Sequence, residues 1–162
     1  MVKALVSLSP MEPTPFFAFE TDFTDSLQCI PMIVRYKLDR CGVKLKLQHW
    51  NQLSRDDRQT LVHQPCTTPG EVAAYRQTVR QQVLQHQPEP PADLPIPDPL
   101  PWEVVAQVPP QVLDQAAQVG QEVTLAQWQA LSPLQRFVLI KLSQPGHENR
   151  NFCPALQEFG LG

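Results

Sequence analysis

The sequence has few of the motifs that usually mark a chemical function. Its 162 residues include only 6 glycines, and no GxGxxG or P-loop motif occurs, so the nucleotide-binding classes that depend on those loops have no support. The nucleophile elbow GxSxG of serine hydrolases is absent as well. The 4 cysteines, at positions 29, 41, 66 and 153, form no CxxC pair, and none of their spacings matches a structural zinc site. The motif content therefore gives no support to these enzyme and metal-site classes.

Positive charge and long apolar runs are also scarce. The net charge is -3 and the isoelectric point is about 5.8, which argues against nucleic acid as a partner because phosphate binding needs a basic surface. No apolar run approaches the ~20 residues that a membrane span requires. Residues 1–15 hold one lysine and are interrupted by Pro10, Pro13 and Pro15, so we interpret them as a flexible cytoplasmic N-terminus rather than a signal peptide.

Proline, by contrast, is in surplus, with 18 residues. Half of residues 88–101 are proline, which rules out a helix there and predicts a stiff, extended connector over residues 87–101. The segments on either side, about 29–64 and 107–142, share nine identical residues at one constant offset of 78. In the first copy these residues are Pro31, Val34, Gly42, Leu47, Trp50, Leu53, Ser54, Arg58 and Leu61. Identity at a fixed offset predicts an internal repeat.

Each copy has the pattern of a helix-turn-helix unit. Gly42 fits the C-terminal cap of a first helix. Leu47, Trp50 and Leu53 then recur every three residues, as on one face of a helix, and Ser54 fits the N-cap of the next helix. The acidic charge and the central Trp favour core packing over DNA binding for these units.

The remaining segments complete the predicted fold. Thr68 and Glu71 fit a capping box that starts a longer helix between the copies. The phenylalanine-rich stretch FFAFETDF, residues 16–23, is predicted to be an extended arm. We therefore expect a mostly α protein in which residues 16–162 form a single domain. It would consist of two pseudo-symmetric helix-turn-helix repeats, joined by the longer helix and the proline-rich connector, with an extended N-terminal arm.

Metal-ligand residue types gather near the C-terminus, in the stretch PGHENRNFC. His147-Glu148 begins like the zinc motif HExxH, but Asn151 takes the place of the second histidine, which disfavours a metal site. Elsewhere, Cys29, Cys41 and Cys66 could gather in space as a metal or cluster site, although buried, reduced thiols are the simpler interpretation.

The same stretch could also hold a nucleophile or a structural turn. Cys153 precedes a predicted short helix, PALQEF, whose N-terminus would lower the pKa of the thiol, with His147 near in sequence. Sequence proximity does not supply the geometry of a catalytic dyad, so this possibility is weak. Asn149 and Asn151 are typical of turns in which the side chain bonds to nearby backbone. We expect a structural loop that also offers a recognition surface.

A basic stretch lies in the first copy, directly after an acidic one. One interpretation is two solvated faces whose surface ion pairs contribute about 0–1 kcal/mol each. The other is a docking surface for a partner with an acidic rim. The basic residues are Arg35, Lys37, Arg40, Lys44 and Lys46, interrupted by Asp39, and the acidic ones are Glu20, Asp22 and Asp25.

Four stretches of the sequence resemble the nitrate-reductase-associated protein family, found mainly in cyanobacteria. They are FAFETDF, CIPMIVRYKLDRCGVKLKLQHW, LQRFVLIKLSQPGHENRNF and PALQEFGL, and the resemblance runs from about Phe16 to Leu161. It implies an accessory protein without catalytic activity or a cofactor of its own. The implied partner is the cytoplasmic assimilatory nitrate reductase, a molybdenum and iron–sulfur enzyme that draws electrons from ferredoxin.

Two functional hypotheses follow. In the first, the protein binds nitrate reductase directly and supports its assembly, stabilisation or activation. In the second, it carries a metal, an iron–sulfur cluster or the molybdenum cofactor on the thiols of Cys29, Cys41 and Cys66. The candidate binding residues for the first hypothesis are Arg35, Lys37, Arg40, His147, Glu148, Asn149 and Asn151.

Overall fold

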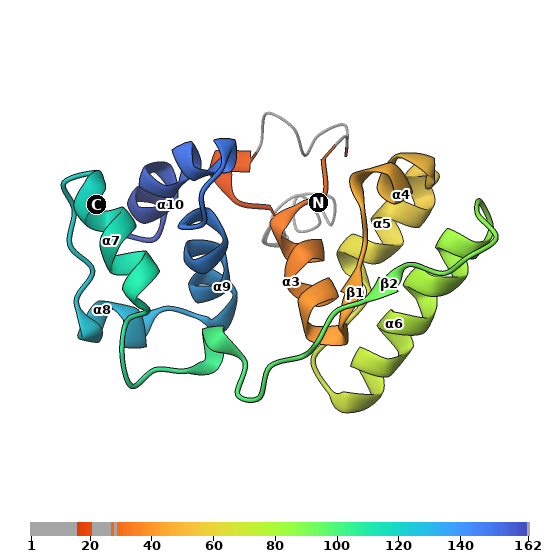
Figure 1. Cartoon of the computed structure of the whole chain (residues 1–162), viewed down its shortest axis with the longest axis horizontal. Helices are drawn as coiled ribbons and strands as arrows, with labels where there is room; N and C mark the ends of the chain where they lie inside the picture. The colour runs from red at the N-terminus through yellow and green to blue at the C-terminus, as the bar shows by residue number, and fades with distance from the viewer. Residues whose placement is uncertain (1–15, 21–26, 28, 162) are drawn as a thin grey trace, which may run out of the picture.

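The computed structural model describes residues 16–20, 27 and 29–161. As predicted, these residues are mostly helical, with only a short two-stranded sheet (Figure 1). The α-helices form two groups, one on either side of the connector. The first group is α3 (Met32–Cys41), α4 (Leu47–Gln52), α5 (Arg55–His63) and α6 (Pro69–Leu84). The second group is α7 (Pro110–Gln118), α8 (Leu125–Ala130), α9 (Pro133–Leu142) and α10 (Phe152–Glu158). Short 3-10 helices are η1 (Ala18–Glu20), η2 (Pro101–Glu103) and η3 (His147–Asn151).

Local sequence signals set several of the helix ends. Thr68 and Glu71 form the predicted capping box of α6, and the Ser54 side chain accepts a hydrogen bond from the third residue of α5. Gly42 ends α3 in the left-handed conformation, with φ of 72°, and its N–H donates to the Leu38 carbonyl. These boundaries confirm the capping predictions.

The helix starts recur at the sequence offset found above. Helices α3, α4 and α5 begin at residues 32, 47 and 55, and α7, α8 and α9 begin at residues 110, 125 and 133. Beyond this point the groups differ, because α5 is followed by the long α6 and α9 by η3 and the short α10. The symmetry relation between the two copies stays a prediction.

Each group encloses its own hydrophobic core, with a tryptophan inside. Trp50 and Trp128 are both fully buried. The indole N–H of Trp50 donates to the Leu27 carbonyl at 2.7 Å, and that of Trp128 donates to the Val104 carbonyl at 3.1 Å. In both groups the tryptophan thus fixes the chain segment that precedes the helices.

The leucines that share the helical spacing of the two tryptophans are not buried with them. The exposed fractions of Leu47 and Leu125 are 52% and 43%. Both residues start their helices, α4 and α8, which are only six residues long. Each of these helices therefore begins at the surface and buries its tryptophan.

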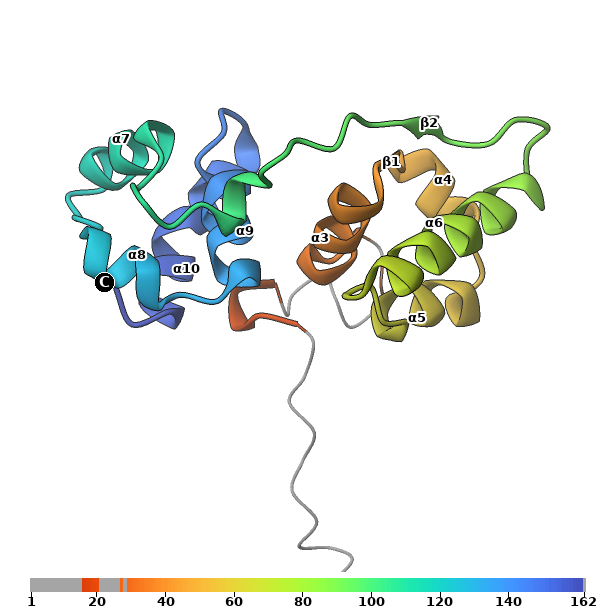
Figure 2. The same ribbon diagram turned by 90° about the horizontal axis from the view of Figure 1, so that it is seen from below.

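The proline-rich connector lies against the first group before it crosses to the second (Figure 2). Within it, β2 (Ala92–Asp93) pairs antiparallel with β1 (Val43–Lys44), which follows the Gly42 turn. The Leu94 N–H extends this pairing by donating to the Gly42 carbonyl at 2.8 Å. Sequence analysis predicted the extended backbone but missed this strand pairing.

The N-terminal arm differs from the prediction. Instead of a continuous extended stretch, Ala18–Glu20 forms the 3-10 helix η1. The buried Glu20 carboxylate accepts hydrogen bonds from the N–H groups of Phe17 and Met32, at 3.1 Å each, so it fastens η1 to the start of α3. The predicted flexible N-terminus, residues 1–15, lies outside the described residues. So do residues 21–23 of the predicted arm and the acidic residues Asp22 and Asp25.

Helices α3 and α9 bring the two groups together. Tyr36 of α3 packs against the rings of Trp102 and Phe137, with centroid distances of 5.8 and 5.4 Å. Lys141 of α9 forms an ion pair with Asp39 of α3 at 3.0 Å. This junction positions the surface described next.

Candidate functional site

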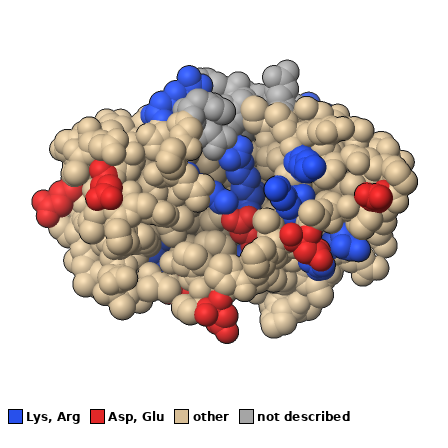
Figure 3. All heavy atoms as spheres, in the orientation of Figure 1, with Lys and Arg blue, Asp and Glu red and all other residues tan. Residues whose placement is uncertain are grey.

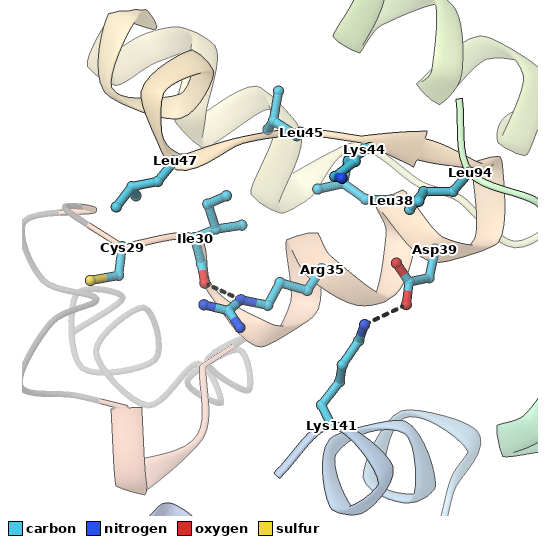
Figure 4. A pocket seen from close by; sticks show the side chains of 10 residues that line it. All are labelled: Cys29, Ile30, Arg35, Leu38, Asp39, Lys44, Leu45, Leu47, Leu94 and Lys141. Carbon is cyan, nitrogen blue, oxygen red and sulfur yellow. Dashed lines mark hydrogen bonds and ion pairs between the residues drawn. The ribbon is translucent and has the colours of Figure 1, made fainter. Parts of the chain in front are cut away.

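A cleft of about 410 Å³ opens where the two groups of helices meet (Figure 4). Its walls come from α3, from β1 and the start of α4, from the connector and from α9. The polar side chains around it are Arg35, Asp39, Lys44 and Lys141. The apolar ones are Ile30, Leu38, Leu45, Leu47 and Leu94, with Cys29 at one end.

The cleft continues past the ion pair between Asp39 and Lys141. A second cavity of about 280 Å³ shares these two residues and Leu94 with the first. Its other lining residues are mainly proline, aromatic and aliphatic: Pro95, Pro97, Pro101, Trp102, Phe137, Ile140 and Gln144. We call the two cavities together the inter-unit groove.

Charged side chains of both signs line the groove. Among the described residues, three cationic side chains and one carboxylate line the larger cavity, and Lys141 pairs with that carboxylate, Asp39. Figure 3 shows Lys and Arg side chains at the middle of this face and over the side of the first group, with acidic side chains nearby.

Of the three basic residues predicted for binding, only Arg35 lines the groove. Its Nε donates to the Ile30 carbonyl at 3.1 Å, which directs the guanidinium along the cleft wall. Lys37 is buried instead, and its Nζ donates to the carbonyls of Val62 and Gln64 at the end of α5. Burial lowers the pKa of Lys37.

Arg40 also has a structural role. Its Nε donates to the Cys66 carbonyl at 2.9 Å, and its Nη2 donates to the Thr67 carbonyl at 3.1 Å. Its Nη1 pairs with Glu103 of η2 at 3.3 Å. Arg40 therefore ties the segment before α6 to the end of the connector, so the predicted basic stretch does not form one continuous surface.

The predicted recognition loop forms η3. Asn149 holds this loop against the rest of the second group. Its Nδ2 donates to the carbonyls of Leu142 and Gln144, and its Oδ1 accepts a hydrogen bond from Gln115 at 2.8 Å. Asn151 precedes α10, where its side chain makes no capping hydrogen bond. The side chains of His147 and Glu148 lie outside the described part of the structure. The loop and the inter-unit groove share no described lining residue.

The cysteines separate into different environments. Cys41 and Cys66 are buried in the core of the first group, whereas Cys29 lines the groove and Cys153 is half-buried. Burial raises the pKa of Cys41 to about 12 and also raises the pKa of Cys66. Cys153 lies inside α10, not at its N-cap as expected. Because the thiolate is the reactive and metal-binding form, the buried pair fits core packing better than ligand binding.

Neither a cluster of metal ligands nor a membrane-spanning helix occurs among the described residues. No three His, Cys, Asp or Glu side chains among them are placed to hold a metal ion together. None of the described helices combines the length and apolar character of a membrane span.

Little in the sequence indicates that two of the lining residues, Lys44 and Lys141, belong to one site. Lys44 was predicted as part of a basic stretch but was not singled out, and Lys141 lies at the end of an apolar helix about a hundred residues away. Only the packing of α3 on α9 brings them to one cleft.

The sequence matches a family described as "Conserved nitrate reductase-associated protein" over residues 16–159. This match confirms the resemblance seen in the four sequence stretches. Searches of curated proteins and of solved structures gave no match.

Proposed function

The chain belongs to the conserved nitrate reductase-associated protein family, and from this membership we propose a non-catalytic accessory protein that binds nitrate reductase directly. By this contact it would support assembly, stabilisation or activation of that molybdenum and iron–sulfur enzyme in the cytoplasm. The inter-unit groove is the observation that carries the proposal, since it offers an apolar floor with charged side chains at its edge, as recognition surfaces do.

Arg35 is the predicted binding residue that we retain at the centre of the contact. Lys37 and Arg40 contribute by holding the surrounding backbone in place. The η3 loop is a separate candidate contact, in which Asn149 supports the backbone and His147, Glu148 and Asn151 would meet the partner.

The alternative, a carrier of metal, cluster or molybdenum cofactor on cysteine thiols, has less support. It needs thiols that a ligand can reach, and two of the three candidates, Cys41 and Cys66, are buried with a raised pKa. Cys29 alone lines the groove, and a single thiol is a poor site for any of these groups.

The test is to mix the purified protein with nitrate reductase produced in cells that lack it. We expect a complex in size-exclusion chromatography and a gain in nitrate reductase activity over a buffer control. Failure to form a complex, with enzyme made either with or without its cofactors, would contradict direct binding. A complex without a gain in activity would restrict the role to assembly or stabilisation.

A further inference from the structure

We infer that part of the connector, residues 92–100, is a hinged strap that opens away from the first group of helices while both hydrophobic cores stay folded. These residues are called the strap below. The inference goes beyond the proposed function, because it concerns a movement of the protein by itself. It rests on the small number of interactions that hold the strap between two firmly anchored ends.

The strap is flanked by buried residues at both ends. Pro91, directly before it, is buried. Trp102, two residues after it, is also buried, and its carbonyl accepts a hydrogen bond from Nε of the buried Arg136 at 2.7 Å. Figure 2 shows the chain between these points passing beside the first group and then crossing to the second. Movement is therefore confined to the residues between the two anchors.

The strap itself buries little surface. Seven of its nine residues are exposed, and the other two, Leu94 and Leu100, are half-buried. Within the described part of the chain, the backbone of residues 95–99 makes no hydrogen bond. The attachment to β1 consists of a two-residue strand pairing and the bond from the Leu94 N–H to the Gly42 carbonyl. Segments with so few buried contacts open at a much smaller free-energy cost than global unfolding.

A carboxylate of the strap latches it to α6. Oδ1 of Asp93 lies 2.6 Å from Nη2 of Arg76 and 3.7 Å from Nη1 of Arg80. Arg76 is held in turn, because its Nη1 donates to the carbonyls of Cys41 and Gly42 at 3.2 Å each. The Asp93 side chain is 64% exposed and that of Arg76 35%, so the ion pair is weak and is screened by salt. Ionic strength should therefore loosen the latch.

Opening of the strap would change the inter-unit groove. Leu94 lines both cavities, and Pro95 and Pro97 line the smaller one, so the strap supplies a wall that the cavities share. With the strap displaced, the two cavities would lose this wall and become one wider cleft. A partner that occupies the wider cleft would bind the open state, and its apparent affinity would include the cost of opening. The strap thus gives the groove a closed and an open state.

Amide hydrogen exchange, measured by NMR on the protein alone, tests the opening. The amide of Leu94 reports on the strap and that of the fully buried Leu139, in α9, reports on the core. After correction for intrinsic rates, we expect Leu94 to exchange about tenfold or more faster than Leu139, because local opening precedes global unfolding. A smaller ratio would mean that the strap opens only with the rest of the protein, and would overturn the inference.

A substitution and a salt series test the latch. Asp93→Ala should raise the exchange rate of Leu94 about threefold and leave that of Leu139 unchanged. The rates are compared with that of Ile96, whose N–H makes no hydrogen bond to the described residues. Raising the salt concentration to about 0.5 M should speed the exchange of Leu94 in the wild-type protein and have no further effect in the variant, since the ion pair is already lost.

The matched control is Glu103→Gln, which removes the ion pair with Arg40 beyond the far end of the strap. It should leave the exchange of Leu94 as in the wild-type protein, and the unchanged rate of Leu139 verifies that each variant is folded. Equal acceleration of Leu94 by both substitutions, equal acceleration of Leu94 and Leu139, or a Leu94 rate that responds to neither Asp93→Ala nor salt would contradict the latch. Because nitrate reductase takes no part in these measurements, the proposed function is tested separately.

Discussion

The guanidinium groups of Arg136 and Arg58 bind backbone carbonyls and so stabilise the fold. Arg136 is buried, and its guanidinium donates to the carbonyls of Trp102, Trp128 and Leu131. Arg58, 78 residues earlier, donates to the carbonyls of Leu27, Trp50 and Asn51. Each arginine satisfies carbonyls at the end of a tryptophan helix and in the segment before the helical unit, which explains why the pair recurs in the sequence. The sequence match at this offset therefore marks a structural role, not a binding one.

The buried Glu20 makes stability depend on pH. Burial raises the pKa of its carboxyl group, although the N–H groups of Phe17 and Met32 act in the opposite direction. A raised pKa in the folded state means that the folded protein binds the proton more tightly. The stabilisation from protonated Glu20 is complete below the pKa that this carboxyl group has in the unfolded chain. It is lost as the pH rises through the pKa of Glu20 in the folded state.

We therefore expect the free energy of unfolding to fall between about pH 4 and pH 7 by more in the wild-type protein than in the Glu20→Gln variant. Urea unfolding at several pH values measures both curves. The variant also loses one carboxylate acceptor, so its absolute stability will differ, and only the slope with pH is compared. Parallel curves would show that Glu20 titrates as it does in the unfolded chain.

At the scale of elements, the glycine turn after α3 ends the helix and also packs against the connector. Gly42 and Gly120 occupy equivalent positions in the two copies, with φ of 72° and 71°. A Cβ on Gly42 would lie 2.9 Å from the Leu94 carbonyl oxygen and 2.9 Å from Ile96 Cγ1, both in the connector. A Cβ on Gly120 would meet no atom within 4 Å. The two glycines therefore share a backbone requirement, but only Gly42 also has a packing requirement.

Alanine at these positions separates the two effects. Gly120→Ala should lower the free energy of unfolding by about 1 kcal/mol, the cost of a left-handed alanine. Gly42→Ala should lower it by about 2–4 kcal/mol, because the methyl group must also displace the connector. Chemical denaturation of both variants measures the difference. Equal losses would mean that the connector is not tightly docked on β1.

The backbone conformation of the connector could be predicted from the sequence, but its strand pairing could not. Its prolines correctly predicted a non-helical segment, because proline lacks the N–H that a helix needs. They gave no indication that Ala92 and Asp93 pair with β1, since a two-residue strand has no alternating pattern to detect. The ion pair of Asp93 with Arg76, at 2.6 Å, joins residues whose proximity depends on that pairing.

At the scale of the whole molecule, features set by neighbouring residues could be predicted from the sequence, whereas the groove could not. Capping residues such as Thr68 and the central tryptophans were predictable, because their signals lie within a few residues of each other. The inter-unit groove was not, because Asp39 and Lys141 are about a hundred residues apart and meet only through the packing of α3 on α9. Arg35 was identified for its charge alone, and the helical spacing did not reveal that Leu47 is exposed.

Tyr36 is one of the side chains that join the two helical groups. Its ring contacts Trp102 and Phe137, which themselves pack edge to face at 5.1 Å, so an α3 residue joins the core of the second group. Tyr36→Ala should remove these contacts and lower the free energy of unfolding by about 2 kcal/mol, less than for a fully buried aromatic ring.

The loss should also weaken the coupling between the groups. We expect the wild-type protein to unfold in one calorimetric transition and the Tyr36→Ala variant to show a broadened or divided one, because each group retains its own core. Tyr36→Phe keeps the ring contacts and should match the wild-type transition. A single sharp transition at the wild-type temperature in Tyr36→Ala would mean that the other contacts, such as buried Met32 and the Asp39–Lys141 pair, suffice to couple the groups. Because the inter-unit groove has walls from both groups, a divided transition should coincide with weaker binding to nitrate reductase.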